Sequence, residues 1–83
     1  MNNVAYINDD LREIKANLPA SYATRWSATK KAAVVRAVKA DVIGLDKALA
    51  LYRLSLGEFR SWQQNYEARG TRGLVAKRLQ MHA

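Results

Sequence analysis

The chain has no cysteine, one proline, one histidine and only seven acidic residues. Without cysteine it can form neither a disulfide bond nor a thiolate metal site, so apolar packing has to stabilise the fold. The one histidine, His82, lies beside the C-terminal residue, and no serine has a histidine placed to activate it. The acidic residues are scattered, with no pair at a spacing typical of a metal site. These absences argue against an enzyme and predict neither a metal nor a cofactor.

Membrane-directed segments are also lacking. The first residues contain no basic cluster and no long apolar run, so no signal peptide is expected. No stretch approaches the apolar length of a membrane span. A chain of 83 residues has room for one small core but not for an enzyme-sized cavity. The sequence therefore predicts a soluble, cytoplasmic protein without a membrane partner.

Positive charge is abundant, and the two signs are segregated along the chain. Of the 14 basic and 7 acidic residues, 2 basic and 3 acidic ones lie in residues 1–24. The other 12 basic and 4 acidic residues lie in residues 25–83, and no acid follows Glu67. A small module with this excess usually binds a polyanion such as nucleic acid, although surface charge also serves solubility alone.

Helix signals divide the chain into a lead-in segment (1–24), a helix-turn-helix core (25–70) and a basic C-terminal tail (71–83). In the lead-in, apolar residues at helical spacing favour a short helix over 9–17, with Asn8 as its cap and Pro19 as its end. An extended arm is the alternative. The tail fits either a strand or a helical turn.

The core segment carries signals for three helices. Ser27 can cap the first, whose residues through Ala40 include neither glycine nor proline. Gly44 then breaks the chain and can act as the next N-cap, and Gly70 is expected to end the last helix in a left-handed conformation. The predicted helices cover residues 28–40, 45–53 and 56 to about 69.

Apolar residues at helical spacing predict how these three helices pack. On the first helix, the alanines at 32, 33 and 37 make one side thin enough for another helix to approach closely. The residues expected to be buried and in mutual contact are Val34, Val38, Leu51, Tyr52, Phe59 and Trp62.

The junction between the second and third predicted helices is the most informative stretch. Ser55 and Glu58 form a capping-box pattern, in which each side chain accepts a hydrogen bond from the backbone N–H of the other residue. A supporting helix, a tight turn at Leu54-Ser55 and a capped second helix are typical of a helix-turn-helix. Two packed helices of a small bundle are the alternative, because short matches of this kind also arise by chance.

The outward face of the last helix is small, polar and almost uncharged. When Phe59 is placed at the centre of the inward arc, with Leu56 beside it, this face lies opposite. Small residues allow close approach to base edges, while Gln64 can pair with adenine and Arg60 with guanine or phosphate. An inert solvent-facing surface is the alternative. The base-contacting candidates are Ser55, Leu56, Gly57, Arg60, Ser61 and Gln64.

Basic residues near the helix starts are candidates for phosphate contact. Lys30 and Lys31 lie in the first turn of their helix, where the macrodipole disfavours cations and favours an anion. Two ordinary exposed lysines are the alternative. Trp26 precedes the Ser27 cap and is interpreted as a hydrophobic staple against the helix rather than a base-stacking platform. The phosphate-contacting candidates are Arg25, Lys30, Lys31 and Arg53.

Several short segments together resemble a known family. They occur in the same order and at similar gaps over roughly residues 18–80: Leu18-Pro19, Arg25-Trp26, Lys31-Ala32-Ala33-Val34-Val35, Tyr52-Arg53-Leu54-Ser55, Glu58-Phe59, Ser61-Trp62-Gln63, Gly73-Leu74 and Arg78-Leu79-Gln80. This pattern resembles the small alphaproteobacterial proteins grouped as DUF1153, which include SciP, the small inhibitor of the cell-cycle regulator CtrA.

The resemblance implies a helical, DNA-binding repressor of genes activated by CtrA. Its partners would be double-stranded DNA, CtrA or a similar response regulator, or both. Gly44 departs from the family, which tends to have serine or threonine at this cap, and Leu49 replaces a small residue. Arg53 stands where many helix-turn-helix proteins have glycine, yet it matches this family. These departures allow for a paralogue with altered targets.

The sequence thus predicts an all-α helix-turn-helix domain that binds DNA as a transcriptional regulator. Two other functions remain as alternatives. One is a protein-interaction module that holds a response regulator without sequence-specific DNA binding. The weaker one is an orphan DNA-binding domain of the transposase type.

Overall fold

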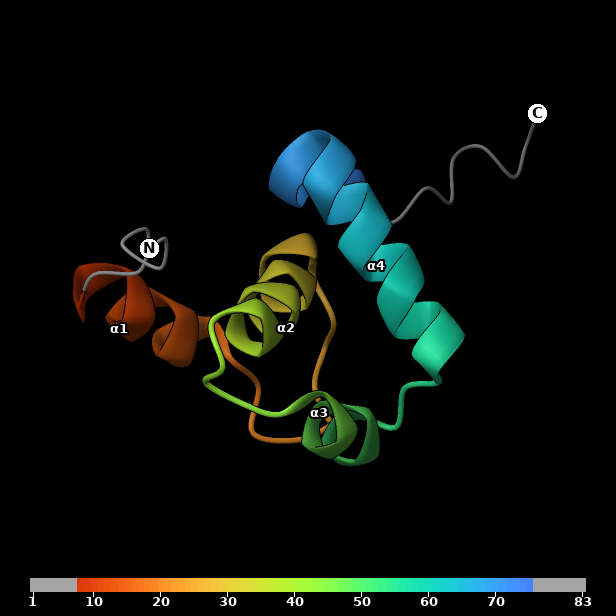
Figure 1. Ribbon diagram of the computed structural model, residues 1–83, viewed down its shortest axis with the longest axis horizontal. Helices are drawn as coiled ribbons and strands as arrows, with labels where there is room; N and C mark the ends of the chain where they lie inside the picture. Colours follow the sequence, from red (N-terminus) through yellow and green to blue (C-terminus); the bar gives the residue numbers. More distant parts are fainter. Residues whose placement is uncertain (1–7, 76–83) are drawn as a thin grey trace.

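The computed structural model describes residues 8–75, with side chains from residue 11 onward, and this part of the chain is all-α as predicted. It contains four α-helices and one short 3-10 helix, arranged as Figure 1 shows. In chain order they are α1 (Asn8–Asn17), α2 (Ala28–Lys39), α3 (Leu45–Tyr52), α4 (Leu56–Arg69) and η2 (Gly70–Leu74).

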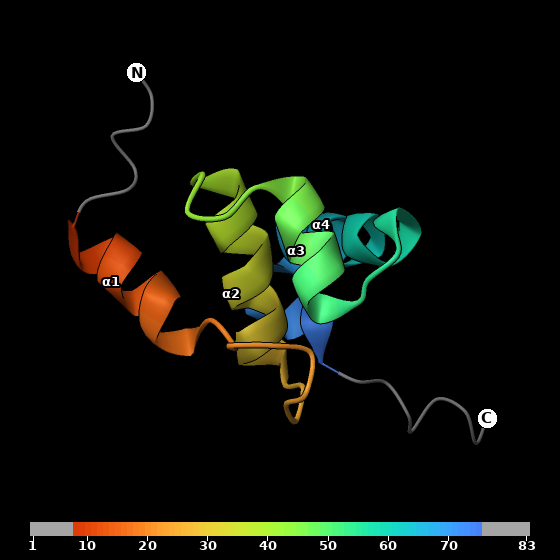
Figure 2. The ribbon, with the colours of Figure 1, turned by 90° about the horizontal axis from the view of Figure 1, so that it is seen from below.

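Helix α2 lies at the centre, and α1, α3, α4 and η2 all pack against it (Figures 1 and 2). Its sequence suits this position, because small side chains let neighbours approach on several sides of the helix. Ile14 of α1, only 1% exposed, and Leu74 of η2, 3% exposed, add to the core from two of these neighbours. The buried residues of α2 itself are Ala32, Ala33, Val34, Val35 and Ala37.

The core cluster joins α2 to α3 and α4. Val34, Tyr52 and Phe59 are buried in it, as predicted, together with Val35 and Ala48. The other three predicted core residues are half-buried and pack against this cluster, so the predicted three-helix core is confirmed: Val38, Leu51 and Trp62.

The predicted helix starts are confirmed by their caps. The Ser27 hydroxyl accepts a hydrogen bond from the Lys30 backbone N–H at 3.2 Å. Ser55 and Glu58 form the full capping box, with distances of 2.9 and 3.0 Å for its two bonds. Gly44 precedes α3 as its N-cap and, having no side chain, leaves that cap without a side-chain hydrogen bond.

Two helix ends differ from the predictions. Asn8 is the first residue of α1 rather than its cap, while the end of α1 at Asn17, ahead of Pro19, is as expected. Gly70 has the expected positive φ of 68°, but its ψ of −155° lies outside the left-handed helical region. The reason is that the chain enters η2 directly at this residue.

Of the two predicted forms of the C-terminal tail, its described part takes the helical one, as a 3-10 turn. Residues 71–74 belong to the 3-10 helix η2, which packs on both α2 and α4. Leu74 is buried there, while Val75, the last described residue, is exposed. The predictions for Leu79 and Met81 lie outside the described residues.

The connector between α1 and α2 is tied to the end of α3. The Tyr52 hydroxyl donates a hydrogen bond of 2.5 Å to the Pro19 carbonyl, and the Tyr22 N–H donates one of 3.2 Å to the Leu51 carbonyl. Figure 2 shows the connector running past the C-terminal end of α3 before it turns into α2. The connector therefore fixes the position of the turn that follows α3.

Replacing Tyr52 with phenylalanine tests this tie. The Pro19 carbonyl loses its donor, so we expect Tyr52→Phe to lower the free energy of unfolding by about 0.5–1.5 kcal/mol. Burial also raises the pKa of Tyr52 above its ordinary value of 10.0. The unfolded chain therefore releases this proton first, and the wild type loses stability as pH rises above 10.0. Urea unfolding at pH 7 and at higher pH should show that the difference in free energy of unfolding between the wild type and Tyr52→Phe becomes smaller as pH rises. A difference that does not change with pH would contradict this role of the Tyr52 hydroxyl.

Candidate functional site

The turn between α3 and α4 consists of residues 53–55 and is closed by backbone hydrogen bonds. Arg53 has a left-handed backbone, with φ 54° and ψ 46°, and its N–H bonds to carbonyls at the end of α3. The Leu54 N–H donates to the Leu49 carbonyl at 2.9 Å. The left-handed Arg53, followed two residues later by the Ser55 cap, turns the chain sharply, so α3 and α4 are consecutive helices with a fixed junction.

Arg53 lies against a ring of the connector. Its guanidinium is 3.8 Å from the centroid of the Tyr22 ring, at a distance suited to a cation–π contact. Both side chains are exposed, so the guanidinium remains accessible next to the start of α4. Sequence reasoning missed Tyr22, because a connector residue 31 positions away carries no spacing signal for this contact.

The six base-contacting candidates all lie exposed on the turn or on α4. The structure thus leaves this face uncovered, including Ser55, whose hydroxyl also accepts the capping bond. Leu56 does not join the inward arc as expected: it is 44% exposed. It is the first residue of α4, where the helix has not yet reached α2, so the helical-wheel argument does not apply to it.

The four phosphate-contacting candidates are placed differently from one another. Arg25 and Arg53 are exposed, while Lys30 and Lys31 are half-buried. The Lys30 ammonium donates to the Thr24 hydroxyl at 2.7 Å and to the Arg25 carbonyl at 3.0 Å, so it braces the connector. The Lys31 ammonium lies 5.6 Å from the centroid of the Trp62 ring.

Trp26 packs between α3 and α4. Its ring is 5.5 Å from that of Tyr52, edge-on, and 5.3 Å from that of Trp62. The half-buried position of Trp26 agrees with its interpretation as a structural residue. The staple was expected to pack on α2, the helix that follows it, whereas these ring contacts are with α3 and α4. Together the three rings hold the start of α2 against α3 and α4.

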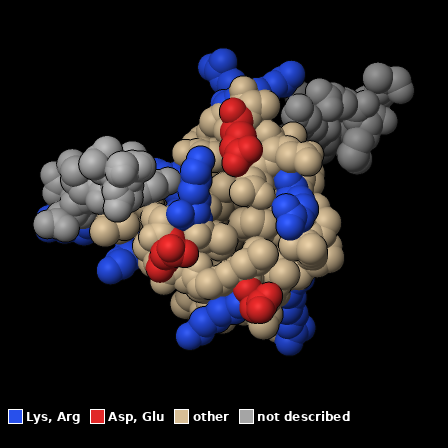
Figure 3. All heavy atoms as spheres, viewed as in Figure 1, with Lys and Arg blue, Asp and Glu red and all other residues tan. Residues whose placement is uncertain are grey.

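The charge is distributed around the molecule rather than gathered in one field. On the face shown in Figure 3, basic side chains lie both around the edge and within the face, with acidic ones among them. The charge excess of the sequence therefore does not form one continuous basic patch on this face.

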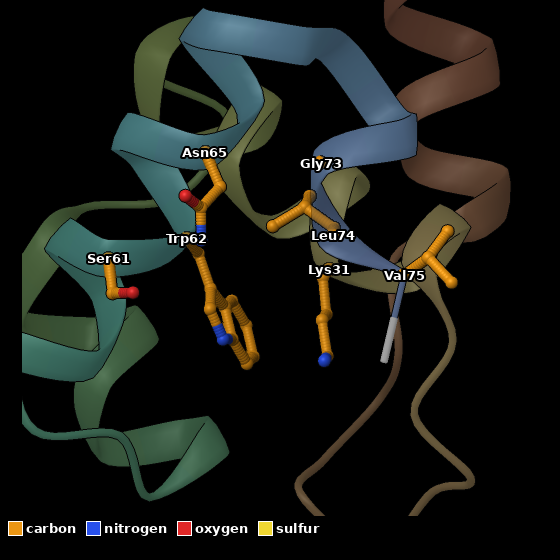
Figure 4. A pocket seen from close by; sticks show the side chains of 7 residues that line it. All are labelled: Lys31, Ser61, Trp62, Asn65, Gly73, Leu74 and Val75. Atoms are coloured by element: carbon orange, nitrogen blue, oxygen red, sulfur yellow. The ribbon is translucent and has the colours of Figure 1, made fainter. Parts of the chain in front are cut away.

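A hollow of about 260 Å³ lies where α2, α4 and η2 meet. It brings together Lys31, a phosphate candidate, and Ser61, a base candidate, although they were predicted for separate roles. Figure 4 shows Lys31 and Trp62 side by side and pointing the same way. The remaining lining residues are Asn65, Gly73, Leu74 and Val75.

Sequence reasoning missed Asn65 and Gly73 at this hollow. Asn65 is one helical turn after Ser61, so its i, i+4 spacing was the available signal. Gly73 lies directly against α4: a Cβ built on it would meet the Asn65 carbonyl oxygen, the Asn65 carbonyl carbon at 3.0 Å and the Arg69 Cβ at 3.1 Å. Only glycine permits this approach of η2 to α4.

The model of one protein family, described as "Protein of unknown function (DUF1153)", matches residues 8–83. The chain belongs to the DUF1153 family. No curated protein and no solved structure matched it. The family resemblance found in the sequence is thus confirmed, and the family description itself assigns no activity.

Two residues singled out in the sequence now have a structural setting. Gly44 serves as N-cap of α3 without a side-chain bond, and Arg53 occupies the left-handed position at the end of the same helix. No helix in the described part of this DUF1153 chain is both long and apolar enough to cross a bilayer. Residues 8–75 also contain no group of three or more side chains that could hold a metal ion.

Proposed function

We propose that this DUF1153 protein is a cytoplasmic helix-turn-helix regulator that binds double-stranded DNA, acting as a SciP-like repressor of CtrA-activated genes. The observation that carries the proposal is the junction of α3 and α4. There a closed turn presents a capped helix whose outward face, at Gly57, Ser61 and Gln64, is exposed, small and polar, with Arg53 on the turn before it. An ordinary solvent-facing helix usually carries glutamate and lysine at such positions.

In this function α4 enters the major groove. Its 14 residues span about 21 Å, and the major groove of B-DNA is wide enough to admit a helix. Gly57 and Ser61 permit close approach to the base edges, while Arg60 and Gln64 supply the hydrogen bonds that distinguish bases. Arg25, Lys30, Lys31 and Arg53 attract the phosphate backbone at the sides.

The distribution of charge supports the second candidate, a module that binds a response regulator. Acidic and basic side chains are interspersed on the face in Figure 3, so this face lacks the continuous basic field that suits DNA and can pair with charges of both signs on a protein. In this case the exposed face of α4 would contact the regulator, and no preference for a DNA sequence would follow.

Binding of the pure protein to random and promoter duplexes across a salt series separates the two candidates. Each phosphate neutralised contributes a log–log slope of about −0.9, so contacts from Arg25, Lys31 and Arg53 alone predict about −2.7. On the preferred site, Arg60→Ala and Gln64→Ala should each cost ~1–3 kcal/mol of binding free energy and weaken random DNA less.

Arg69→Ala is the matched control, because it removes the same charge from the exposed far end of α4. It should weaken all duplexes alike and leave the sequence preference intact. If the Arg60 and Gln64 variants keep the full preference, α4 is not the recognition helix. If the protein binds no DNA at low salt yet binds a purified response regulator tightly, the interaction module is the correct function.

A further inference from the structure

We propose that the hollow between α2, α4 and η2 is a phosphate-binding site, with the Lys31 ammonium as its cation. The inference deepens the proposed function, in which Lys31 already contacts the phosphate backbone, by naming the site in which this lysine holds a phosphate, and it rests on that function for a DNA source of the phosphate. The phosphate can belong to the DNA backbone or to a free phosphate monoester, and the two sources share this chemistry. The donors that would hold it are Lys31, Ser61 and Asn65.

The charge of the hollow is one-sided. Its seven lining residues include one cation and no carboxylate, although acidic residues occur elsewhere on α4. Lys31 is half-buried, with its ammonium held 5.6 Å from the centroid of the Trp62 ring. The contact with the ring keeps the ammonium beside the hollow, within reach of an anion bound there. A carboxylate-free hollow with a positioned cation favours a phosphate over neutral or cationic ligands.

Neutral donors lie beside the cation. Ser61 and Asn65 are one turn apart on α4 and both line the hollow, so they lie on the same side of that helix (Figure 4). Neither side chain hydrogen-bonds to another described residue, so the hydroxyl and the amide are available to a ligand. Phosphate oxygens accept hydrogen bonds from both kinds of group as well as from lysine. The hollow, at about 260 Å³, leaves room for the ester group that a phosphate carries.

One wall of the hollow is formed by η2, which is already packed against α4 when no ligand is bound. Gly73 packs directly on the backbone of α4 at Asn65, and the neighbouring Leu74 is buried. The hollow therefore keeps its shape without a ligand, which reduces the ordering cost of binding.

The first experiment follows the Trp62 indole N–H resonance during titration with inorganic phosphate, against sodium chloride at equal ionic strength. Phosphate should shift it saturably and chloride should not. Lys31→Gln should weaken phosphate binding about fivefold to tenfold, in line with the loss of a charge-assisted hydrogen bond. Lys39→Gln is the matched control, because it removes the same charge from an exposed position at the other end of α2 and should change nothing. No saturable shift in the wild type overturns the proposal.

The second experiment identifies the source of the phosphate by measuring duplex affinity for the same variants. If the source is DNA, Lys31→Gln and Asn65→Ala weaken every duplex several-fold more than Lys39→Gln does. If these variants match Lys39→Gln on DNA but have lost the phosphate shift, the hollow takes a free phosphate monoester. A wild type that binds no DNA but shows the saturable shift refutes the proposed function and leaves this site standing. Equal shifts in Lys31→Gln, Asn65→Ala and Lys39→Gln refute the site.

Discussion

Phe59→Ala is expected to lower the free energy of unfolding by about 3–5 kcal/mol. Phe59 is 3% exposed and belongs to the cluster that joins α2, α3 and α4, so its removal leaves a cavity that three elements cannot fill together. Proteins have total free energies of unfolding of only about 5–15 kcal/mol, and a domain this small lies near the lower end, so a loss of this size removes most of its stability. Urea unfolding followed by circular dichroism measures the loss.

The control for Phe59 lies one turn earlier on the same helix. Leu56 is 44% exposed, so Leu56→Ala removes an apolar side chain that contributes little to the core. The urea midpoint of this variant should therefore stay near that of the wild type. If the two variants unfold at the same urea concentration, the cluster around Phe59 does not hold the three helices together.

Gly73→Ala should destabilise the fold by about 1–3 kcal/mol or more, through steric overlap rather than through a lost contact. The added methyl group would meet the backbone of Asn65, which cannot rotate away as a side chain could. Either η2 moves off α4 or α4 bends, and the burial of Leu74 suffers in both cases. For a domain of this size each kcal/mol lowers the melting temperature by about 4–8 °C.

The same substitution at Gly57 provides a control of opposite sign. Its nearest neighbour would be the Ser55 hydroxyl oxygen at 3.9 Å, an ordinary contact distance. Alanine is favoured over glycine inside a helix by up to about 1 kcal/mol, so Gly57→Ala should raise the melting temperature slightly. A thermal melt in which both variants shift in the same direction would mean that η2 does not pack on α4 as described.

Features that depend on neighbours in sequence were predictable. The Ser27 cap and the Ser55–Glu58 capping box involve residues three apart, so the pattern alone contains both partners of each bond. The core residues Tyr52 and Phe59 followed from helical spacing for the same reason.

Features that depend on distant segments were not predictable from such patterns. The role of Gly73 requires η2 to fold back onto α4, and the contact of Lys30 with Thr24 requires the path of the connector. Leu56 was placed inward because a helical wheel assumes that the core extends along the whole helix, which fails at its first residue. The candidate site divides in the same way. The exposed face of α4 was predicted, and the helical spacing from Ser61 could have added Asn65, whereas Tyr22 joins the site only because the connector packs against the turn.

The left-handed backbone of Arg53 has a consequence for engineering. A residue other than glycine costs about 1–2 kcal/mol in this conformation, and glycine would remove that cost. A design that maximised thermal resistance would therefore choose glycine here and lose the cation that rests on Tyr22. At this turn the natural chain is less stable than a variant with glycine would be. In exchange, it keeps a guanidinium next to the N-terminal end of α4.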